Sequence, residues 1–237
     1  MTLGPSVGEE LDLLAARYGL QAPARGRLGS VLEGLIGDAR APTSVREPRE
    51  ALENHIADSL VALELPEVRA ARTVADIGSG AGLPGLVLAA VLEEAEFRLV
   101  ESQASKCAFI AGLGARAAVA NARVVCSRAE EWAEGRGLQD VIVCRALAAQ
   151  PVALEYAAPL LREGGRLVDW RGTRSEEEEQ RALLAAGALG LALVEIRRVL
   201  PFASARDRHL HVFEKLAPTP AAFPRRVGLA RKRPLGG

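Results

Sequence analysis

The feature that most constrains the fold of this chain is a glycine-rich turn directly after a short apolar run. The run "TVADI" at residues 73–77 is followed by four glycines within eight residues, at Gly78, Gly80, Gly82 and Gly85. A chain accepts so many glycines where its backbone turns sharply or lies close against a ligand. The segment therefore predicts a strand that ends in a ligand-binding loop.

Beyond this loop, short apolar or β-branched runs alternate with helical patterns as far as "DRHLHVFEKL", a last strand-like run at residues 207–216. The helical patterns begin at Pro84, near Ser105 and near Arg128, and cover residues 151–161 and 176–188. Such alternation forms parallel β-α-β units and predicts an α/β doubly wound sheet. Ligands of these sheets bind beyond the carboxyl ends of the strands, so we expect the site residues there.

The two ends of the chain differ from this central region. Apolar residues at three- and four-residue spacing predict three helices within residues 1–66, at 8–20, 27–39 and 46–65. The last 21 residues are rich in proline and arginine and show no periodicity, which favours an extended arm. We therefore expect an N-terminal helical extension (1–66), a core (67–216) and a basic C-terminal arm (217–237).

Charge is unevenly distributed, although the formal net charge is zero. The segment from Arg197 to Gly237 holds ten basic and two acidic residues, which is typical of a protein with a polyanionic partner. The three cysteines form no C-x-x-C pair, so we expect neither a metal site nor a disulfide framework. Without a secretory signal or a bilayer-length apolar stretch, the chain is expected to be cytoplasmic and to make no membrane contact.

The glycine loop fits two kinds of cofactor. Gly80, Gly82 and Gly85 satisfy the dinucleotide pattern G-x-G-x-x-G, which is a weak signal alone. Asp76 favours S-adenosylmethionine, because a carboxylate would repel a pyrophosphate but attract the cationic sulfonium and ammonium groups. The second strand ends in Glu101, whose carboxylate can bind ribose hydroxyls of either cofactor.

Further segments then point to one family. Five segments follow one another in the order that is typical of this family, between about residue 43 and the C-terminus: "HIADSL", "DIGSGAGLPG", "SRAEE", "CRALA" and "FPRRVGLARKRPL". With these motifs the chain resembles the bacterial 16S ribosomal RNA guanine-N7 methyltransferases, formerly called glucose-inhibited division protein B. The resemblance implies a class I S-adenosylmethionine-dependent methyltransferase, with a Rossmann-like sheet of seven strands whose last strand is antiparallel. It also implies that the target is N7 of a guanine (nucleotide 527) in the 530 loop of 16S rRNA.

The resemblance assigns roles to particular residues. It implies a cofactor site formed by Asp76, Gly78, Gly80, Gly82, Leu83, Glu101, Ala129, Glu130 and Arg145. Glu130 can equally be an acid at a helix start, favoured by the helix dipole. Arg145 is also expected to position the reacting base through O6 or a phosphate, because N7 must stay free to react; a solvated arginine that caps a loop is the alternative.

RNA contacts are expected from two other regions. The helix at 46–65 carries His55 and Ser59 four residues apart, hence on one face, which either closes over the ligands or is an ordinary polar surface. The basic residues expected to bind phosphates are Arg171, Arg225, Arg226, Arg231 and Lys232. A solubilising tail is the alternative for the arm.

The absence of other methyltransferase motifs agrees with methyl transfer to a ring nitrogen. N7 of guanine has a free lone pair, so methyl transfer needs alignment of the reacting atoms but no general base. The chain has "CRALAAQP" where enzymes that methylate exocyclic amines carry an Asn/Asp-Pro-Pro-Tyr/Phe segment. Cys144 lacks the preceding proline of pyrimidine-C5 methyltransferases, so we interpret it as a small buried strand residue.

Two segments depart from the family pattern. The usual Trp-Asn and Asn-Leu-Thr segment is replaced by "IGDARAPT", which keeps only Thr43, and a Lys-Gly pair becomes Arg171-Gly172. A class I methyltransferase for another RNA or a small molecule therefore stays open, as do a non-catalytic ribosome-binding protein and, least favoured, a nicotinamide oxidoreductase. We expect a monomer that acts on 16S rRNA, free, in an assembly intermediate or in the small ribosomal subunit.

Overall fold

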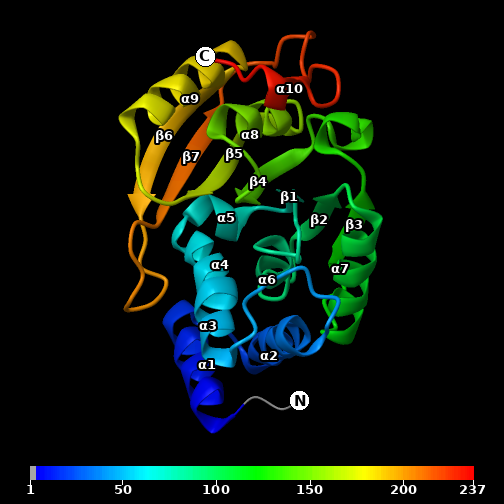
Figure 1. Cartoon of the computed structure of the whole chain (residues 1–237), viewed down its shortest axis with the longest axis vertical. Helices are drawn as coiled ribbons and strands as arrows, with labels where there is room; N and C mark the ends of the chain where they lie inside the picture. Colours follow the sequence, from blue (N-terminus) through cyan, green and yellow to red (C-terminus); the bar gives the residue numbers. More distant parts are fainter. Residues whose placement is uncertain (1–3) are drawn as a thin grey trace.

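The computed structural model describes residues 4–237 and is built around one seven-stranded sheet (Figure 1). The strand order is β3-β2-β1-β4-β5-β7-β6. The strands are β1 (Thr73–Ile77), β2 (Glu96–Glu101), β3 (Ala122–Cys126), β4 (Gln139–Arg145), β5 (Leu161–Arg171), β6 (Leu191–Arg198) and β7 (His209–Lys215). β7 is antiparallel to both of its neighbours, whereas the pairs from β3 to β5 are parallel. The predicted class I methyltransferase fold is thereby confirmed.

Helices cover both faces of this sheet (Figure 1). One buried apolar cluster joins the N-terminal helices, α6 and α7 to the sheet, and a second joins α8, α9 and α10 to it. The helices outside the stretch 48–70 are α1 (Pro5–Tyr18), α2 (Ala22–Gly37), α6 (Gly85–Ala89), α7 (Ala104–Arg116), α8 (Gln150–Ala157), α9 (Glu176–Ala188) and α10 (Leu229–Lys232). None of the helices described combines the length and apolar character needed to cross a bilayer.

β1 shows how the sheet positions the site. The strand is buried between β2 and β4, and its last four residues are fully covered or nearly so. Buried parallel strands are apolar on both faces, as "TVADI" is except at Asp76. Because β1, β2 and β4 run parallel, their carboxyl ends meet at one edge, where the chain order of the sheet reverses around β1.

The predicted helix at 46–65 is helical throughout most of its length but not uniform. It consists of α3 (Pro48–Ala51), a π-helical segment (Leu52–Ala57), α4 (Asp58–Leu60) and a 3-10 segment (Val61–Glu64), and α5 (Pro66–Ala70) follows. The Glu47 carboxylate accepts hydrogen bonds from the backbone amides of Arg49 and Glu50, which explains the start. The apolar side of this stretch, including Leu52 and Ile56, is buried in the same cluster as Leu86 of α6.

Three further expectations from the sequence need correction. The helix predicted from Arg128 is replaced by two 3-10 turns, Ala129–Glu131 and Ala133–Gly135. The helix predicted over 151–161 ends at Ala157, because Leu161 already belongs to β5. The predicted extended arm is not extended: it folds back onto α8, and it contains the short helix α10, whose Ala230 is buried. Ser175 caps α9, since its side chain accepts a hydrogen bond from the amide of Glu178.

Candidate functional site

A cavity of about 410 Å³ opens at the carboxyl ends of β1, β2 and β4. Four loops after strands line it, through Gly78–Ala81 with Leu83, Glu101–Gln103 with Lys106, Ser127–Glu130, and Arg145–Leu147. Residues from both ends of the chain complete the lining: Pro42, Thr43 and His55 on one side, and Tyr156 of α8 and Arg231 of α10 on the other. The volume lies in the range of small-molecule sites.

The glycine loop depends on backbone conformations that other residues avoid. Gly78, Gly80 and Gly82 have φ angles of +75°, +57° and +90°. The Gly78 amide donates to the carbonyl of Val100 at 2.8 Å, which fixes the loop against the end of β2. A Cβ atom at Gly78 would lie 2.4 Å from Cδ1 of Leu147, across the cavity lining. Both the turn and the close approach of two loops therefore require glycine here.

Asp76 lies beneath this loop instead of in the cavity. Its side chain is fully buried, and its Oδ2 accepts a hydrogen bond from the Gly85 amide at 3.0 Å. Burial raises the pKa of this carboxyl to about 7. Asp76 does not line the cavity, and it holds the loop through Gly85, while its Oδ1 has no partner among the residues described. The expected position beside the amino-acid end of the cofactor stays a prediction.

Glu101 at the end of β2 lines the cavity. Its Oε2 accepts from the Gly80 amide at 3.0 Å, and its Oε1 accepts from the Gln103 amide at 2.9 Å. These bonds join the loops after β1 and β2 and leave an acceptor group facing the space between them. A carboxylate at this position is what ribose hydroxyls require.

The opposite part of the cavity lies beside the loop after β3. Ala129 and Glu130 line it within a 3-10 turn, together with Tyr156 of α8. Burial and the nearby Glu130 carboxylate raise the pKa of the Tyr156 phenol, so it stays protonated at neutral pH. Tyr156 and Lys106 were not singled out from the sequence; the position of Lys106, within the helix that follows Glu101, was the available signal.

Arg145 ends β4 and is held by the N-terminal helices. Its Nη1 donates to Oδ2 of Asp58 at 2.6 Å and to the Asn54 carbonyl at 3.1 Å. Asp58 is itself fixed, since Trp170 Nε1 donates to its carbonyl oxygen at 2.8 Å. The sequence placed Asp58 on the same helix as His55 but gave it no role, and the structure shows it as the partner that orients Arg145.

His55 lines the cavity near Arg145. Its Nε2 lies 3.0 Å from Oγ1 of Thr43, while its buried Nδ1 has no hydrogen-bond partner among the residues described. Burial and the Arg145 guanidinium lower the pKa of this imidazole below its ordinary value of 6.5. His55 is therefore a neutral histidine at pH 7, with Nε2 beside Thr43 and Nδ1 buried.

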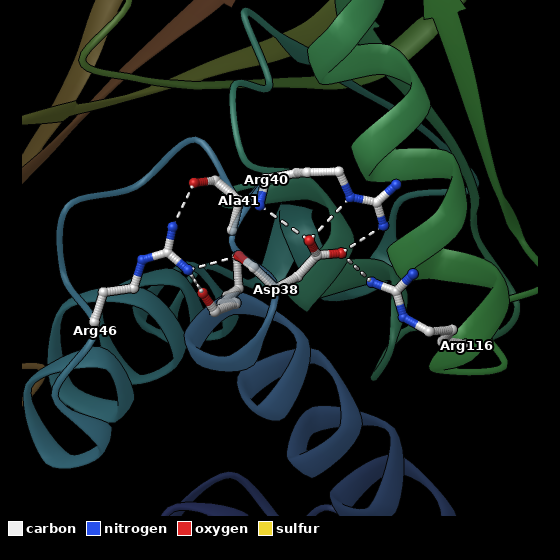
Figure 2. Close-up of polar contacts among 6 residues, drawn as sticks. Asp38, Arg40, Ala41, Arg46 and Arg116 are labelled. Atoms are coloured by element: carbon white, nitrogen blue, oxygen red, sulfur yellow. Dashed lines mark hydrogen bonds and ion pairs between the residues drawn. The ribbon is translucent and has the colours of Figure 1, made fainter. Parts of the chain in front are cut away.

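The loop of residues 38–46, which carries Thr43, is held by Arg46 (Figure 2). The guanidinium donates to the carbonyls of Leu35 (3.2 Å), Asp38 (2.6 Å) and Ala41 (2.9 Å). Three carbonyls around one planar cation fix the path of the backbone. This is the segment that departs from the family pattern, and its shape comes from contacts to main-chain atoms.

A second set of contacts in Figure 2 centres on the Asp38 carboxylate. Oδ1 accepts from the backbone amide and Nε of Arg40, both at 3.0 Å, and Oδ2 accepts from Arg40 Nη2 at 2.8 Å and from Arg116 of α7 at 3.4 Å. Hydrogen bonds from Arg40 hold the pKa of Asp38 well below its ordinary range. The Arg116 contact attaches the loop to the helix that follows β2.

Comparison with known proteins identifies the family. A family model described as rRNA small subunit methyltransferase G matches residues 35–209. A protein named ribosomal RNA small subunit methyltransferase G from Syntrophomonas wolfei is 44% identical over 186 residues, 78% of this chain and 86% of that relative. Its namesake from Rubrobacter xylanophilus is 40% identical over 86% of this chain and 80% of that relative. The chain belongs to this family.

Solved structures agree with the fold. A S-adenosylmethionine-dependent methyltransferase from Aquifex aeolicus superposes with a TM-score of 0.55 at 17% identity, over 79% of this chain and 98% of that one. TYW2 from M. jannaschii in complex with AdoMet gives 0.51 at 14% identity, over 67% and 77%. As a member of the methyltransferase G family, the chain is an enzyme that uses S-adenosylmethionine.

The cavity fits that cofactor on observations of this chain alone. Gly80 leaves open space on the side where a Cβ atom would stand, with only the Gly78 carbonyl oxygen within 4 Å. Glu101 supplies a carboxylate beside it, and the 3-10 turn at Ala129 and Glu130 supplies a wall at the far side. These residues would hold the methionine, ribose and adenine parts respectively.

Two of the residues expected to contact RNA make contacts within the protein instead. Ser59 is fully buried, and its Oγ donates to the His55 carbonyl at 2.5 Å, so it cannot reach an RNA chain. Arg225 forms an ion pair with Glu155, whose side chain is 1% exposed, so its guanidinium serves the attachment of the arm. Helical spacing did not predict the burial of Ser59, and arginine content did not predict the ion pair of Arg225.

The other expected RNA contacts remain predictions. Arg171 donates through Nε to Asp169 at 2.7 Å and through Nη2 to the Ala148 carbonyl at 3.1 Å, which leaves three of its five N–H donors for a phosphate. Arg226 and Lys232 are exposed on the arm of this methyltransferase G family member. Arg231 is exposed as well, but it lines the cavity.

Proposed function

We propose that this enzyme transfers a methyl group from S-adenosylmethionine to N7 of a guanine in 16S rRNA, at nucleotide 527 in the 530 loop. The observation that carries the proposal is the position of Arg145. It lines the same cavity as the glycine loop and His55, and its guanidinium is oriented by Asp58. Family membership supports the RNA class, because the relatives are named as methyltransferases of small-subunit ribosomal RNA.

The chemistry asks little of the side chains beyond orientation. The bound cofactor supplies an electrophilic methyl group on a sulfonium, and N7 presents a lone pair without losing a proton. Arg145 donates to O6 of the guanine or to a phosphate, which leaves N7 free. Fixing the base in line with the methyl group contributes several kcal/mol to the rate acceleration. Asp58 contributes by keeping the guanidinium in one orientation.

His55 and Thr43 form the wall where the base enters. With its pKa lowered, His55 is neutral at pH 7 and adds no positive charge beside a base that becomes cationic on methylation. Exposed cations on the arm, Arg226 and Lys232, neutralise phosphates without reading sequence. Binding of the RNA should therefore weaken as salt is raised.

The test offers methyl-labelled S-adenosylmethionine and small ribosomal subunits that lack this modification to the purified protein. Nuclease digestion and mass spectrometry then locate the label. We expect one labelled N7-methylguanine in the 530 loop. Label on another nucleotide would overturn the proposed target, and absence of label, when a known rRNA methyltransferase labels its own target, would overturn the activity.

A pair of variants tests the role of Arg145. Arg145→Ala should lower turnover about a hundredfold while cofactor affinity changes much less, because alignment of the base is lost. Arg136→Ala is the matched control, since Arg136 is exposed and lies outside the cavity lining. Equal turnover in the two variants would contradict the role at the base.

A further inference from the structure

The C-terminal arm is attached to the core by a buried ion pair. Nε of Arg225 donates to both carboxylate oxygens of Glu155, at 2.9 and 3.1 Å, and its backbone amide donates to Oε1 at 3.2 Å. The Arg225 guanidinium also lies 5.9 Å from the centre of the Phe223 ring. Glu155 belongs to α8, the helix that carries Tyr156 into the cavity. The arm is therefore fixed one residue away from the cavity wall.

From this attachment the arm runs along the cavity beside the loop after β3. The Gly228 amide donates to Oε1 of Glu130 at 3.3 Å, and Ala230 is buried in the apolar cluster of α8. Nη2 of Arg231 then donates to the Leu147 carbonyl at 3.1 Å. Glu130 and Leu147 both line the cavity, so the arm braces two of its walls as well as adding Arg231 as a third.

Arg231 differs from the cations beside it in the arm. Among residues 4–237, the side chains of Arg226, Lys232 and Arg233 have no hydrogen-bond or ion-pair partner and do not line the cavity. Arg231 lines it together with Ala129, Glu130 and Tyr156. Two of its neighbours are thus an acidic and an aromatic side chain at the part of the cavity assigned to adenine.

We propose that the C-terminal arm forms one wall of the cofactor site and that Arg231 contacts the adenine ring of S-adenosylmethionine. A guanidinium is planar, so it can either stack on a flat ring system or donate through its free N–H groups to ring nitrogens. One Nη of Arg231 is already used by Leu147, which fixes the plane of the group. The arm thus serves the cofactor through Arg231, and its outward cations face the solvent where RNA would bind.

The experiment measures cofactor affinity by calorimetry with no RNA present. Arg231→Ala should weaken binding of S-adenosylmethionine about tenfold. Arg233→Ala removes the same charge two residues away and should leave the affinity within about twofold. Adenosine serves as a second probe: the loss should persist with it, because the contact is to the adenine.

The outcomes separate this proposal from others. Wild-type cofactor affinity in Arg231→Ala would overturn the contact. Equal losses in Arg231→Ala and Arg233→Ala would overturn it also, as a general charge effect. Tm values of both variants check the fold, and Arg231→Lys should recover only part of the affinity if planarity matters. Because no RNA is used, failure of the proposed methylation target would leave this result unaffected.

Discussion

Two segments outside the sheet reach the cavity from opposite ends of the chain, and they are held in different ways. The loop of residues 38–46 is held mainly to backbone carbonyls close to it in sequence, the most distant being 11 residues from Arg46. The arm is held by side-chain contacts to residues far away, 70 positions for Arg225 and Glu155 and 98 for Gly228 and Glu130. The conformation of the loop is set mainly by contacts close in sequence, whereas the conformation of the arm is set by contacts to the core.

The two arrangements should respond differently to the loss of one side chain. The three carbonyls bound by Arg46 are neutral, so loss of this arginine removes hydrogen bonds but leaves no buried charge unpaired. A carboxylate that is 1% exposed cannot regain water without moving, so Glu155 depends on its ion-pair partner. Loss of one ion-pair residue should therefore destabilise the arm strongly, whereas loss of one arginine should destabilise the loop less.

The largest effect is expected from Arg225→Ala. The substitution leaves the buried Glu155 carboxylate without its partner, which costs about 3–5 kcal/mol in free energy of unfolding. Urea unfolding measures this, with Arg226→Ala as the adjacent control at less than about 0.5 kcal/mol. The double variant Arg225→Met with Glu155→Leu should recover most of the loss, since no buried charge is left. A cost below about 1 kcal/mol for Arg225→Ala would contradict the expectation that substitution destabilises the arm more than the loop.

The next effect is expected from Arg46→Ala, at about 2–3 kcal/mol, because three carbonyls lose a charged donor. Arg40→Ala in the same loop should cost less than about 1 kcal/mol, since that side chain is 77% exposed and its pair with Asp38 is at the surface. Methyl transfer should fall with Arg46→Ala while S-adenosylmethionine affinity holds, as the loop carries Thr43 to His55. Equal stability of the two variants would show that the loop does not depend on its backbone contacts.

The part of the site that sequence predicted is the part built by local rules. Glycines at positive φ follow from what a strand-to-loop turn permits, and Glu101 was expected from its place at the end of the second strand. Gly78, Gly80 and Glu101 all lie at the cavity. The sheet followed from alternating periodicities, since each strand and helix buries its own apolar residues. These features need no knowledge of distant contacts.

The rest depended on tertiary partners that composition does not reveal. Arg225 and Arg226 are adjacent arginines of one basic segment, yet one is tied to Glu155 and the other faces solvent. The orientation of Asp76, toward the Gly85 amide instead of the cavity, is a matter of packing under the loop. Likewise, spacing placed Ser59 on the face of His55 but could not show that this face is buried.

The smallest effect concerns pH and the contact between His55 and Thr43 of the loop. Burial, followed by the Arg145 guanidinium, keeps the pKa of His55 below 6.5, the value it regains on unfolding. Below pH 6.5 the unfolded chain therefore binds a proton that the folded chain does not, so the contribution of His55 is present above pH 6.5 and declines as pH falls. The decline cannot exceed about 1.4 kcal/mol per pH unit.

The measurement compares unfolding free energies of the wild type and His55→Gln at pH 7.5, 6.5 and 5.5. Glutamine can still pair with Thr43 but does not titrate, so the stability of the wild type should fall relative to the variant as pH decreases. The stability cost of Arg225→Ala should also shrink as pH decreases, because the buried Glu155 carboxylate, once it has lost the guanidinium, is relieved by taking up a proton. Parallel curves for the wild type and His55→Gln would show that His55 is not held neutral by its surroundings. A cost of Arg225→Ala that does not change with pH would show instead that water reaches the Glu155 carboxylate once the arginine is lost.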